Sequence, residues 1–305
     1  MSVARFGLRT RSGQVSGLIQ RDSFISSFLL ELYPNATSAY SLRRLRSTYL
    51  GNAIRVRRSS DNAEQDIGFA NNVLDTASML TFCGAGNGFV TTWYDQSGNA
   101  NNITQTTATN QPQIVSSGSV LTTNGKPHIQ FDGSNDSLFN SVQMPLINRS
   151  VFFVMKEISR ISDSGIFGLR PQTGNDFNQL DAYEFQGQNT GANRQYGAFG
   201  STSVSYVLQK NGSATIIPHV LINEIKGGST GSLYENNTLI TTDSSFTEFN
   251  ALSFGGFALS ARWFTTANLS LFGNNIFQEF VYYGSDQANN RTGINANINT
   301  FYGIY

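Results

Sequence analysis

Alternation of apolar and polar residues dominates the chain from Ile54 onward. IRVRR at 54–58 and PHIQFDG at 127–133 place apolar side chains at every second position, as in strands with one buried face. SVFFVMKEI at 150–158 is instead a near-continuous apolar run, which is typical of a strand buried on both faces. Turn residues separate such segments at short intervals. The pattern predicts an all-β, antiparallel sandwich of the jelly-roll kind.

Helical spacing is confined to two segments. Residues 37–50 have leucines three residues apart and a serine, Ser38, that can cap a short N-terminal helix. Residues 285–305 predict a closing amphipathic helix, with Ser285 or Asp286 at its start. Its apolar face is formed by Ile294, Ile298, Phe301 and Tyr302.

Pro34-Asn35 interrupts the chain and suggests a boundary. We expect an N-terminal attachment segment at 1–36 and a sandwich domain at 37–305. The apolar run FISSFLLELY at 24–33 is shorter than the about 20 residues that a membrane span requires. It also begins too late for the apolar part of a signal peptide, so neither a membrane span nor a secretion signal is expected.

Charge changes this picture at the N-terminus. The chain has no net charge and only 13% charged residues. Residues 1–60 nevertheless hold ten arginines against Asp22 and Glu31, which is +8 and leaves −8 for the remainder. Nucleic-acid contact is open, and so is pairing with carboxylates of the rest of the chain or of a neighbouring subunit. The second is favoured because guanidinium groups suit interface carboxylates. A homo-oligomer and no nucleic-acid partner are expected. The predicted partner-binding residues are Arg5, Arg9, Arg11 and Arg21.

Few residues offer nucleophilic or metal chemistry. Cys83 is the single cysteine, so neither a disulfide within the chain nor a thiolate metal cluster can form, and its apolar surroundings predict a buried, inert thiol. His128 and His219 are interpreted as strand histidines. GAGNG at 84–88 is interpreted as a hairpin loop between two strands rather than a phosphate cradle, because no helix follows it.

TTWYDQSGNANN at 91–102 concentrates side-chain oxygens where a strand ends. Three interpretations are open: the loop only builds the fold, it holds Ca²⁺ through Asp95 and Asn101 or Asn102, or it binds sugar hydroxyls. The Asx turn at 132–136 is open to the same three. No cofactor is expected apart from this possible Ca²⁺. The candidate ligand-binding residues are Trp93, Tyr94, Asp95, Asn99 and Asn102.

Several motifs carry a resemblance to known families. FDGSNDSL, SVFFVMK, LSFGG and the C-terminal FQEFVYYGSDQANNRTG resemble the ordered signature of concanavalin A-like (laminin G-like) domains. AYSLRRLR, IRVRRSSDNAEQDIGF, TFC and TTWYDQSGNANNITQ resemble the start of the arabinofuranosidase B catalytic domain, over roughly residues 39–135. Such modules, joined to a short N-terminal segment, also resemble bacteriophage virion proteins.

The resemblance implies where catalytic carboxylates belong. The acid/base aspartate of arabinofuranosidase B follows a Gly-Gly, where this chain has Phe257, and the nucleophile corresponds most nearly to Glu184, with Asp181 close by. Since phenylalanine transfers no proton, we expect a non-enzymatic virion structural protein that is located in the virion. Its expected partners are other virion proteins and host cell-surface glycans. The alternatives are a retaining arabinofuranosidase-type glycoside hydrolase and a calcium-dependent lectin module.

Overall fold

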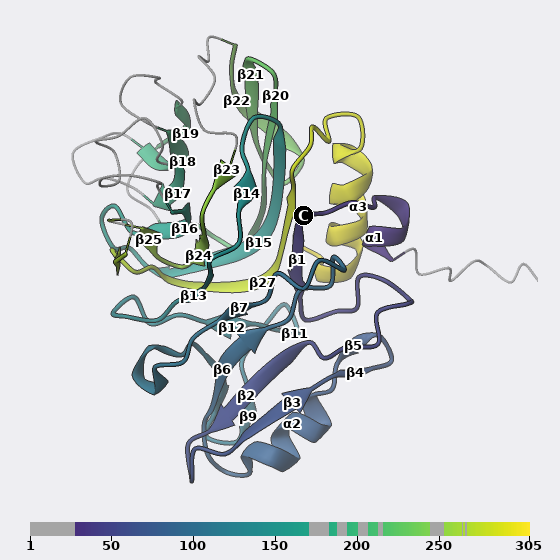
Figure 1. The fold of residues 1–305 in the computed structure, drawn as a ribbon, viewed down its shortest axis with the longest axis vertical. Coiled ribbons are helices and arrows are strands. Elements are labelled where there is room, and N and C mark those ends of the chain that lie inside the picture. Colours follow the sequence, from purple (N-terminus) through teal and green to yellow (C-terminus); the bar gives the residue numbers. More distant parts are fainter. Residues whose placement is uncertain are drawn as a thin grey trace, which may run out of the picture.

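The fold is described by a computed structural model that covers residues 28–170, 183–187, 194–200, 207–212, 216–244, 253–263, 265 and 267–305 (Figure 1). Every strand pairing within these residues is antiparallel, and most of the strands join one large curled sheet. The prediction of an all-β antiparallel fold is confirmed. The curl brings two layers face to face, because each strand adds a twist to the next.

The first layer is centred on the two longest strands, which pair with each other. It contains β1 (Ser38–Ser41), β27 (Asn274–Tyr283), β15 (Arg149–Ser159), β20 (Val220–Gly227), β21 (Thr230–Glu235) and β22 (Thr238–Asp243). The second layer faces it. It contains β13 (Leu138–Asn140), β24 (Phe257–Leu259), β16 (Gly165–Leu169), β17 (Tyr183–Gly187), β18 (Arg194–Gly200) and β19 (Val207–Asn211).

A third group of strands, called the basal strands here, lies below the sandwich in Figure 1, with α2 (Thr76–Cys83) beside them. The group joins the first layer through the β12–β27 pairing and the second through β7–β13. It contains β2 (Ile54–Arg58), β3 (Glu64–Ile67), β6 (Gly88–Trp93), β7 (Ile103–Thr104), β8 (Gln113–Ser116), β9 (Ser119–Val120) and β12 (Ile129–Gln130).

Short strand pairs complete the described part. They are β4 (Phe69–Ala70) with β5 (Val73–Leu74), β10 (Thr122–Thr123) with β11 (Lys126–Pro127), β14 (Met144–Pro145) with β23 (Ser253–Phe254), and β25 (Arg262–Trp263) with β26 (Leu269–Ser270). One 3₁₀ turn covers Ala108–Asn110. No helix in the described ranges is long and apolar enough to cross a membrane.

Two hydrophobic cores lie on opposite faces of the first layer, which explains the apolar run at 150–158. Val151 and Phe153 of β15 point into the core between the two layers. Phe152 and Val154 point into a second core. A strand buried on both faces needs no polar alternation, so this sequence interpretation is confirmed.

The second core is covered by α1 (Leu29–Leu32) and α3 (Arg291–Tyr302), which lie beside the sheet in Figure 1. The C-terminal helix is confirmed: Ile294, Ile298 and Tyr302 are buried. It begins at Arg291, however, so neither Ser285 nor Asp286 caps it. Burial of Leu29 and Leu30 ties the end of the predicted attachment segment to this core, whereas residues 1–27 lie outside the described residues.

Two local predictions are wrong. Residues 38–41 form strand β1 rather than a helix, because Ala39 packs in the second core and Tyr40 in the first, which is the alternation of a strand. GAGNG at 84–88 joins helix α2 to strand β6 rather than two strands. Gly84 ends that helix at φ 59°, a conformation that glycine adopts at no steric cost.

Candidate functional site

The loop at 94–102 follows strand β6 and forms hydrogen bonds with strand β1. Both carboxylate oxygens of Asp95 are occupied: Oδ1 accepts the backbone N–H groups of Ala39 (2.8 Å) and Ser97 (2.9 Å). Oδ2 accepts the Ser97 hydroxyl (2.6 Å) and the N–H of Asn101 (3.0 Å). Asp95 is only 3% exposed. Its side-chain oxygens therefore satisfy backbone donors that would otherwise be buried without partners.

The amide side chains of this loop are used in the same way. Asn99 and Asn101 each donate through Nδ2 to the carbonyl of Thr37, at 3.1 and 2.8 Å. Asn102 Oδ1 accepts the N–H of Asp95 at 2.9 Å. Of the three interpretations of the loop, these contacts favour construction of the fold. No group of three His, Cys, Asp or Glu that could hold a metal ion occurs among the described residues.

The two aromatic ligand-binding candidates of the loop, Trp93 and Tyr94, differ in how deeply they are buried. Trp93 is completely buried in the core between the layers, so it has no surface to offer a ligand. Tyr94 is half-buried and its hydroxyl donates to Asp66 at 2.7 Å. Ligand binding by Tyr94, Asn99 and Asn102 stays a prediction.

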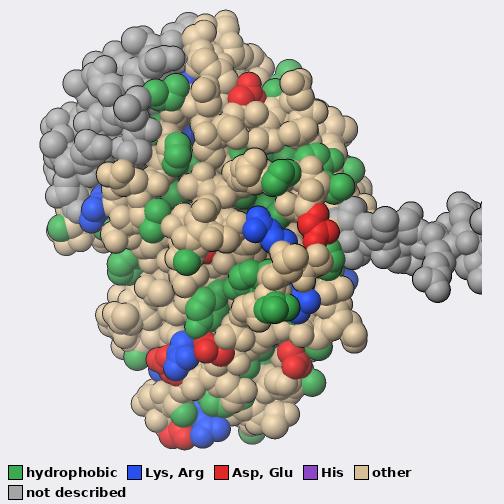
Figure 2. All heavy atoms as spheres, turned by 45° about the vertical axis from the view of Figure 1, so that its right-hand side comes forward, with side chains coloured by type: hydrophobic (Ala, Val, Ile, Leu, Met, Phe, Trp, Pro, Cys, Tyr) green, Lys and Arg blue, Asp and Glu red, His purple; other side chains and the backbone are tan. Residues whose placement is uncertain are grey.

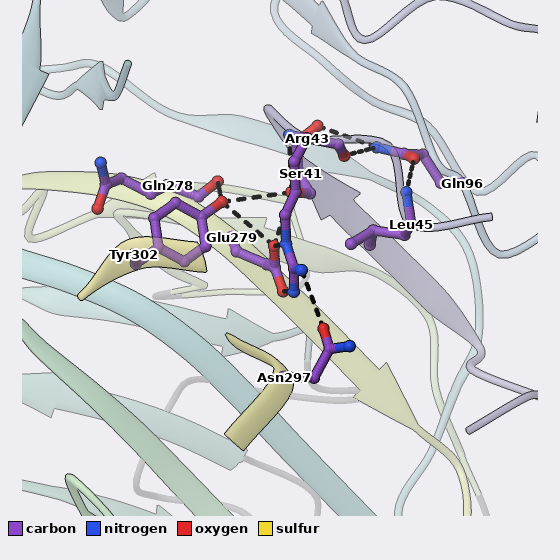
Figure 3. A network of polar contacts seen from close by, with 8 residues as sticks. All are labelled: Ser41, Arg43, Leu45, Gln96, Gln278, Glu279, Asn297 and Tyr302. Carbon is purple, nitrogen blue, oxygen red and sulfur yellow. Dashed lines mark hydrogen bonds and ion pairs between the residues drawn. The ribbon is translucent and has the colours of Figure 1, made fainter. Parts of the chain in front are cut away.

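A buried ion pair beneath α3 joins this loop to the C-terminal helix (Figure 3). Arg43 contacts both carboxylate oxygens of Glu279, at 2.8 and 2.9 Å, and their side chains are 9% and 0% exposed. Glu279 also accepts the hydroxyl of Ser41 at 2.7 Å, and the hydroxyl of Tyr302 lies 3.2 Å from it. These groups partner one another, so we assign them a structural role. The loop reaches the network through Gln96, which donates to the carbonyls of Ser41 and Arg43.

Each of the two histidines contacts a polar side chain through one ring nitrogen. Both precede a strand rather than lying within one, because β12 begins at Ile129 and β20 at Val220. His128 Nδ1 lies 3.0 Å from the hydroxyl of Thr123, and His219 Nε2 lies 2.7 Å from Oε1 of Gln278. Burial lowers the pKa of His128 to about 4. His128 is therefore a buried neutral imidazole at neutral pH.

Acid should destabilise the protein through His128. Its pKa is lowered on folding, so the unfolded state takes up the proton first and stability falls between the ordinary pKa of about 6.5 and about 4. We expect a loss of about 2 kcal/mol in the free energy of unfolding between pH 7.5 and pH 5. Urea unfolding of the wild type and His128→Gln at both pH values measures it. Equal losses in the two proteins would contradict the prediction.

A polar pocket opens where the basal strands meet the FDGSND turn. Its volume is about 350 Å³, and we call it the Asp132–Asp136 pocket. Its walls combine carboxylates, amides and an aromatic ring, a mixture of polar and apolar groups that is typical of small-molecule sites. The pocket is lined by Phe89, Ala108, Thr109, Gln111, Gln113, Gln130, Asp132 and Asp136.

The two aspartates of this pocket have different environments. Asp132 Oδ1 accepts the backbone N–H groups of Ser134 (2.7 Å) and Asn135 (3.3 Å), as an Asx turn does. Asp136 is 6% exposed, and its Oδ2 accepts the N–H of Asp132 at 3.1 Å. Burial, and then the charge of Asp132, raise the pKa of Asp136 to about 7. A carboxyl group that still holds its proton near neutral pH can act as a general acid.

The pocket wall is held in place by hydrogen bonds. Arg57 donates through Nε to Oε1 of Gln111 at 2.6 Å, and its guanidinium lies 4.8 Å from the ring centroid of Phe89. Gln113 lies opposite Gln130 across the β8–β12 pairing. The FDGSND turn is visible in the sequence, but Phe89, Gln113 and Gln130 come from three different strands, and Gln111 lies just before β8. No sequence signal marked them as neighbours of Asp136.

Glu224 and Glu235 are two other carboxylates that accept hydrogen bonds from tyrosine hydroxyls. Glu224 pairs with Arg149 at 2.6 Å and accepts the hydroxyl of Tyr183, and all three are completely buried. Glu235 pairs with Lys210 at 2.7 Å and has a 15% exposed side chain. Burial raises the pKa of Glu224, but no substrate can reach a fully enclosed group. We assign this cluster to holding the two layers together.

The remaining predicted site residues are outside the described side chains. Glu184 has its backbone in β17, where it pairs with Gly168 and Phe199, and its side chain is not described. Asp181 and the four predicted partner-binding arginines lie outside the described residues altogether.

Phe257 is a core residue. Its side chain is completely buried between the layers, 4.9 Å from the ring centroid of Phe280 and stacked on Tyr40 at 6.0 Å. A side chain that faces the core does not occupy a substrate site. Its identity therefore says nothing about the carboxylates that face solvent, and the inference of a lost proton donor does not hold.

Comparison with known proteins gives results for both sequence and fold. Residues 33–134 match the family model for the catalytic domain of α-L-arabinofuranosidase B. The α-L-arabinofuranosidase B of Penicillium canescens is 32% identical over 96 residues, which is 29% of this chain and 21% of that protein.

Solved structures extend the likeness over most of the chain. An arabinofuranosidase complexed with arabinofuranosyl-α-1,2-xylobiose superposes with a TM-score of 0.63 and 17% identity. A GH54 α-L-arabinofuranosidase soaked with a cyclic sulfate inhibitor gives 0.59 and 16%. Each alignment covers 88% of this chain and 64% of the solved chain, so this chain spans less than two thirds of those proteins.

These findings overturn the expectation of a non-enzymatic virion protein. None of the matches above concerns a virion protein, and both the sequence and the structural matches are to arabinofuranosidases. The supposed loss of catalysis rested on Phe257, which is a core residue. The chain therefore has the fold of solved arabinofuranosidases, and its residues 33–134 match the catalytic domain of α-L-arabinofuranosidase B in sequence.

Proposed function

We propose that this chain is a glycoside hydrolase domain that removes terminal α-L-arabinofuranosyl groups from carbohydrates. One observation carries the proposal: the segment that matches the arabinofuranosidase B catalytic domain, residues 33–134, contains every wall residue of the Asp132–Asp136 pocket except Asp136 itself. Asp136 follows two residues later. The matched segment thus builds a polar pocket that ends in a carboxyl group with a raised pKa.

Glycoside hydrolysis needs two carboxyl groups with different roles. The protonated Asp136 would give its proton to the glycosidic oxygen while the bond from that oxygen to the sugar carbon breaks. A second carboxylate would either activate water or attack the sugar carbon directly. Asp132 in the same pocket is the nearest candidate, and the resemblance to arabinofuranosidase B assigns the nucleophile to Glu184.

Hydrolysis of 4-nitrophenyl α-L-arabinofuranoside tests the proposal. We expect the purified chain to release 4-nitrophenol faster from this substrate than from the matching β-xylopyranoside or β-galactopyranoside. Glu184→Gln and Asp132→Asn should then identify the second carboxylate, because the correct one loses activity by at least about a hundredfold. Asp61→Asn, on an exposed turn, is the matched control. No release above that of heat-denatured protein would contradict the proposed function.

A further inference from the structure

The face that carries α3 has an apolar groove that the Asp132–Asp136 pocket does not include. Two adjoining hollows of about 280 and 200 Å³ share Val73 and Phe301, and we call them together the α3 groove. Figure 2 shows this face, with hydrophobic side chains gathered across its middle and basic side chains beside them. The apolar lining includes Phe28, Leu42, Val73, Leu74, Pro127 and Phe301.

Two cations of this groove lack an acidic partner among the described residues. The ammonium of Lys126 lies 4.2 Å from the ring centroid of Phe301, and no described carboxylate forms an ion pair with it. Arg44 Nε is buried without a hydrogen-bond partner in the described part of the chain, and its guanidinium lies 5.4 Å from the ring of Phe69. Arg43 differs, because Glu279 neutralises it. Cations in partly desolvated surroundings favour an anionic ligand.

The rest of the groove is neutral and can form hydrogen bonds. Thr76 and Thr122 line the larger hollow, and Asn71 and Asn72 line the smaller one. No aspartate or glutamate occurs among the lining residues of either hollow. The groove therefore combines an apolar floor, hydroxyl and amide groups at its sides, and a positive charge at each of two places.

We propose that the α3 groove binds an acidic oligosaccharide that carries a uronic acid. The C–H face of a sugar ring would pack on Phe301 and Pro127, as apolar faces do on aromatic rings. The uronate carboxylate would pair with Lys126 through charge-assisted hydrogen bonds, and Arg44 in the adjoining hollow would add a second positive charge. Sugar hydroxyls would reach the threonines and asparagines. The choice of a saccharide over an acidic peptide rests on the proposed function.

Isothermal titration calorimetry with two probes tests this site. The probes are xylotriose substituted with glucuronic acid and unsubstituted xylotriose. Neither contains an arabinofuranosyl group, so binding is measured independently of the proposed hydrolysis. We expect the acidic probe to bind at least about tenfold more tightly than the neutral one, and added salt to weaken it, because one charge-assisted contact is worth about that factor.

Substitutions inside and outside the α3 groove test whether the acidic probe binds there. Lys126→Gln should weaken binding of the acidic probe by about tenfold, and Lys126→Arg, which keeps the charge, should retain most of it. Arg291→Gln removes the same charge at the other end of α3 and should leave the affinity unchanged. Equal binding of both probes, or an unchanged affinity in Lys126→Gln, would overturn the proposal. Tighter binding of hexaglutamate than of the acidic saccharide would overturn it too, in favour of an acidic protein partner.

Discussion

Replacing Asp136 by asparagine should reduce kcat/KM on 4-nitrophenyl α-L-arabinofuranoside by at least about a hundredfold, because a general acid contributes roughly 10²–10⁴ in rate. Asparagine has nearly the same shape and can keep the contact with the N–H of Asp132, but it has no carboxyl proton to give. The loss should appear mainly in kcat rather than in KM.

The pH profile gives this prediction a second readout. The pKa of Asp136 is raised to about 7, so the proton-donating form predominates below pH 7 and is lost above it. Activity of the wild type should therefore fall as the pH rises through about 7, and the residual activity of Asp136→Asn should lack that fall. A full rate in Asp136→Asn, or the same alkaline fall in both proteins, would exclude Asp136 as the acid.

Glu279→Gln should destabilise the fold by about 3–5 kcal/mol, because it leaves the buried charge of Arg43 without its partner. The ion pair is nearly excluded from solvent, and it links β1, β27 and α3 (Figure 3). Urea unfolding at pH 7 measures the effect. A loss of that size is a large part of the 5–15 kcal/mol by which most domains are stable.

Two further variants make the measurement specific. Glu64→Gln breaks an exposed ion pair with Arg55, where both side chains are more than a third exposed, and it should cost less than about 1 kcal/mol. The double variant Arg43→Met/Glu279→Leu removes both charges and should recover much of the stability that Glu279→Gln loses. A double variant that is as unstable as the single one would show that the shape of the site, rather than the unpaired charge, is decisive.

The sequence alone was sufficient for the all-β class, the buried strand at 150–158 and the C-terminal helix. These features depend on the local period of apolar residues, which a chain displays whatever its neighbours are. The strand β1 could not be predicted in this way. Leu42, Leu45 and Tyr49 have helical spacing, and only pairing with β27 and the presence of a core on each face make residues 38–41 extended.

In the candidate site, too, some properties follow from the sequence and others only from the tertiary structure. The sequence determined which residues could do chemistry: a lone cysteine, two histidines and two turns rich in carboxylates and amides. Only the tertiary structure decided what each of them does. It occupies both oxygens of Asp95 with backbone donors, buries Phe257 in the core, and brings Phe89 and three glutamines around Asp136. The physical reason is that burial and hydrogen-bond partners depend on strands far apart in the chain, and these set whether a carboxylate is a structural anchor or a proton donor.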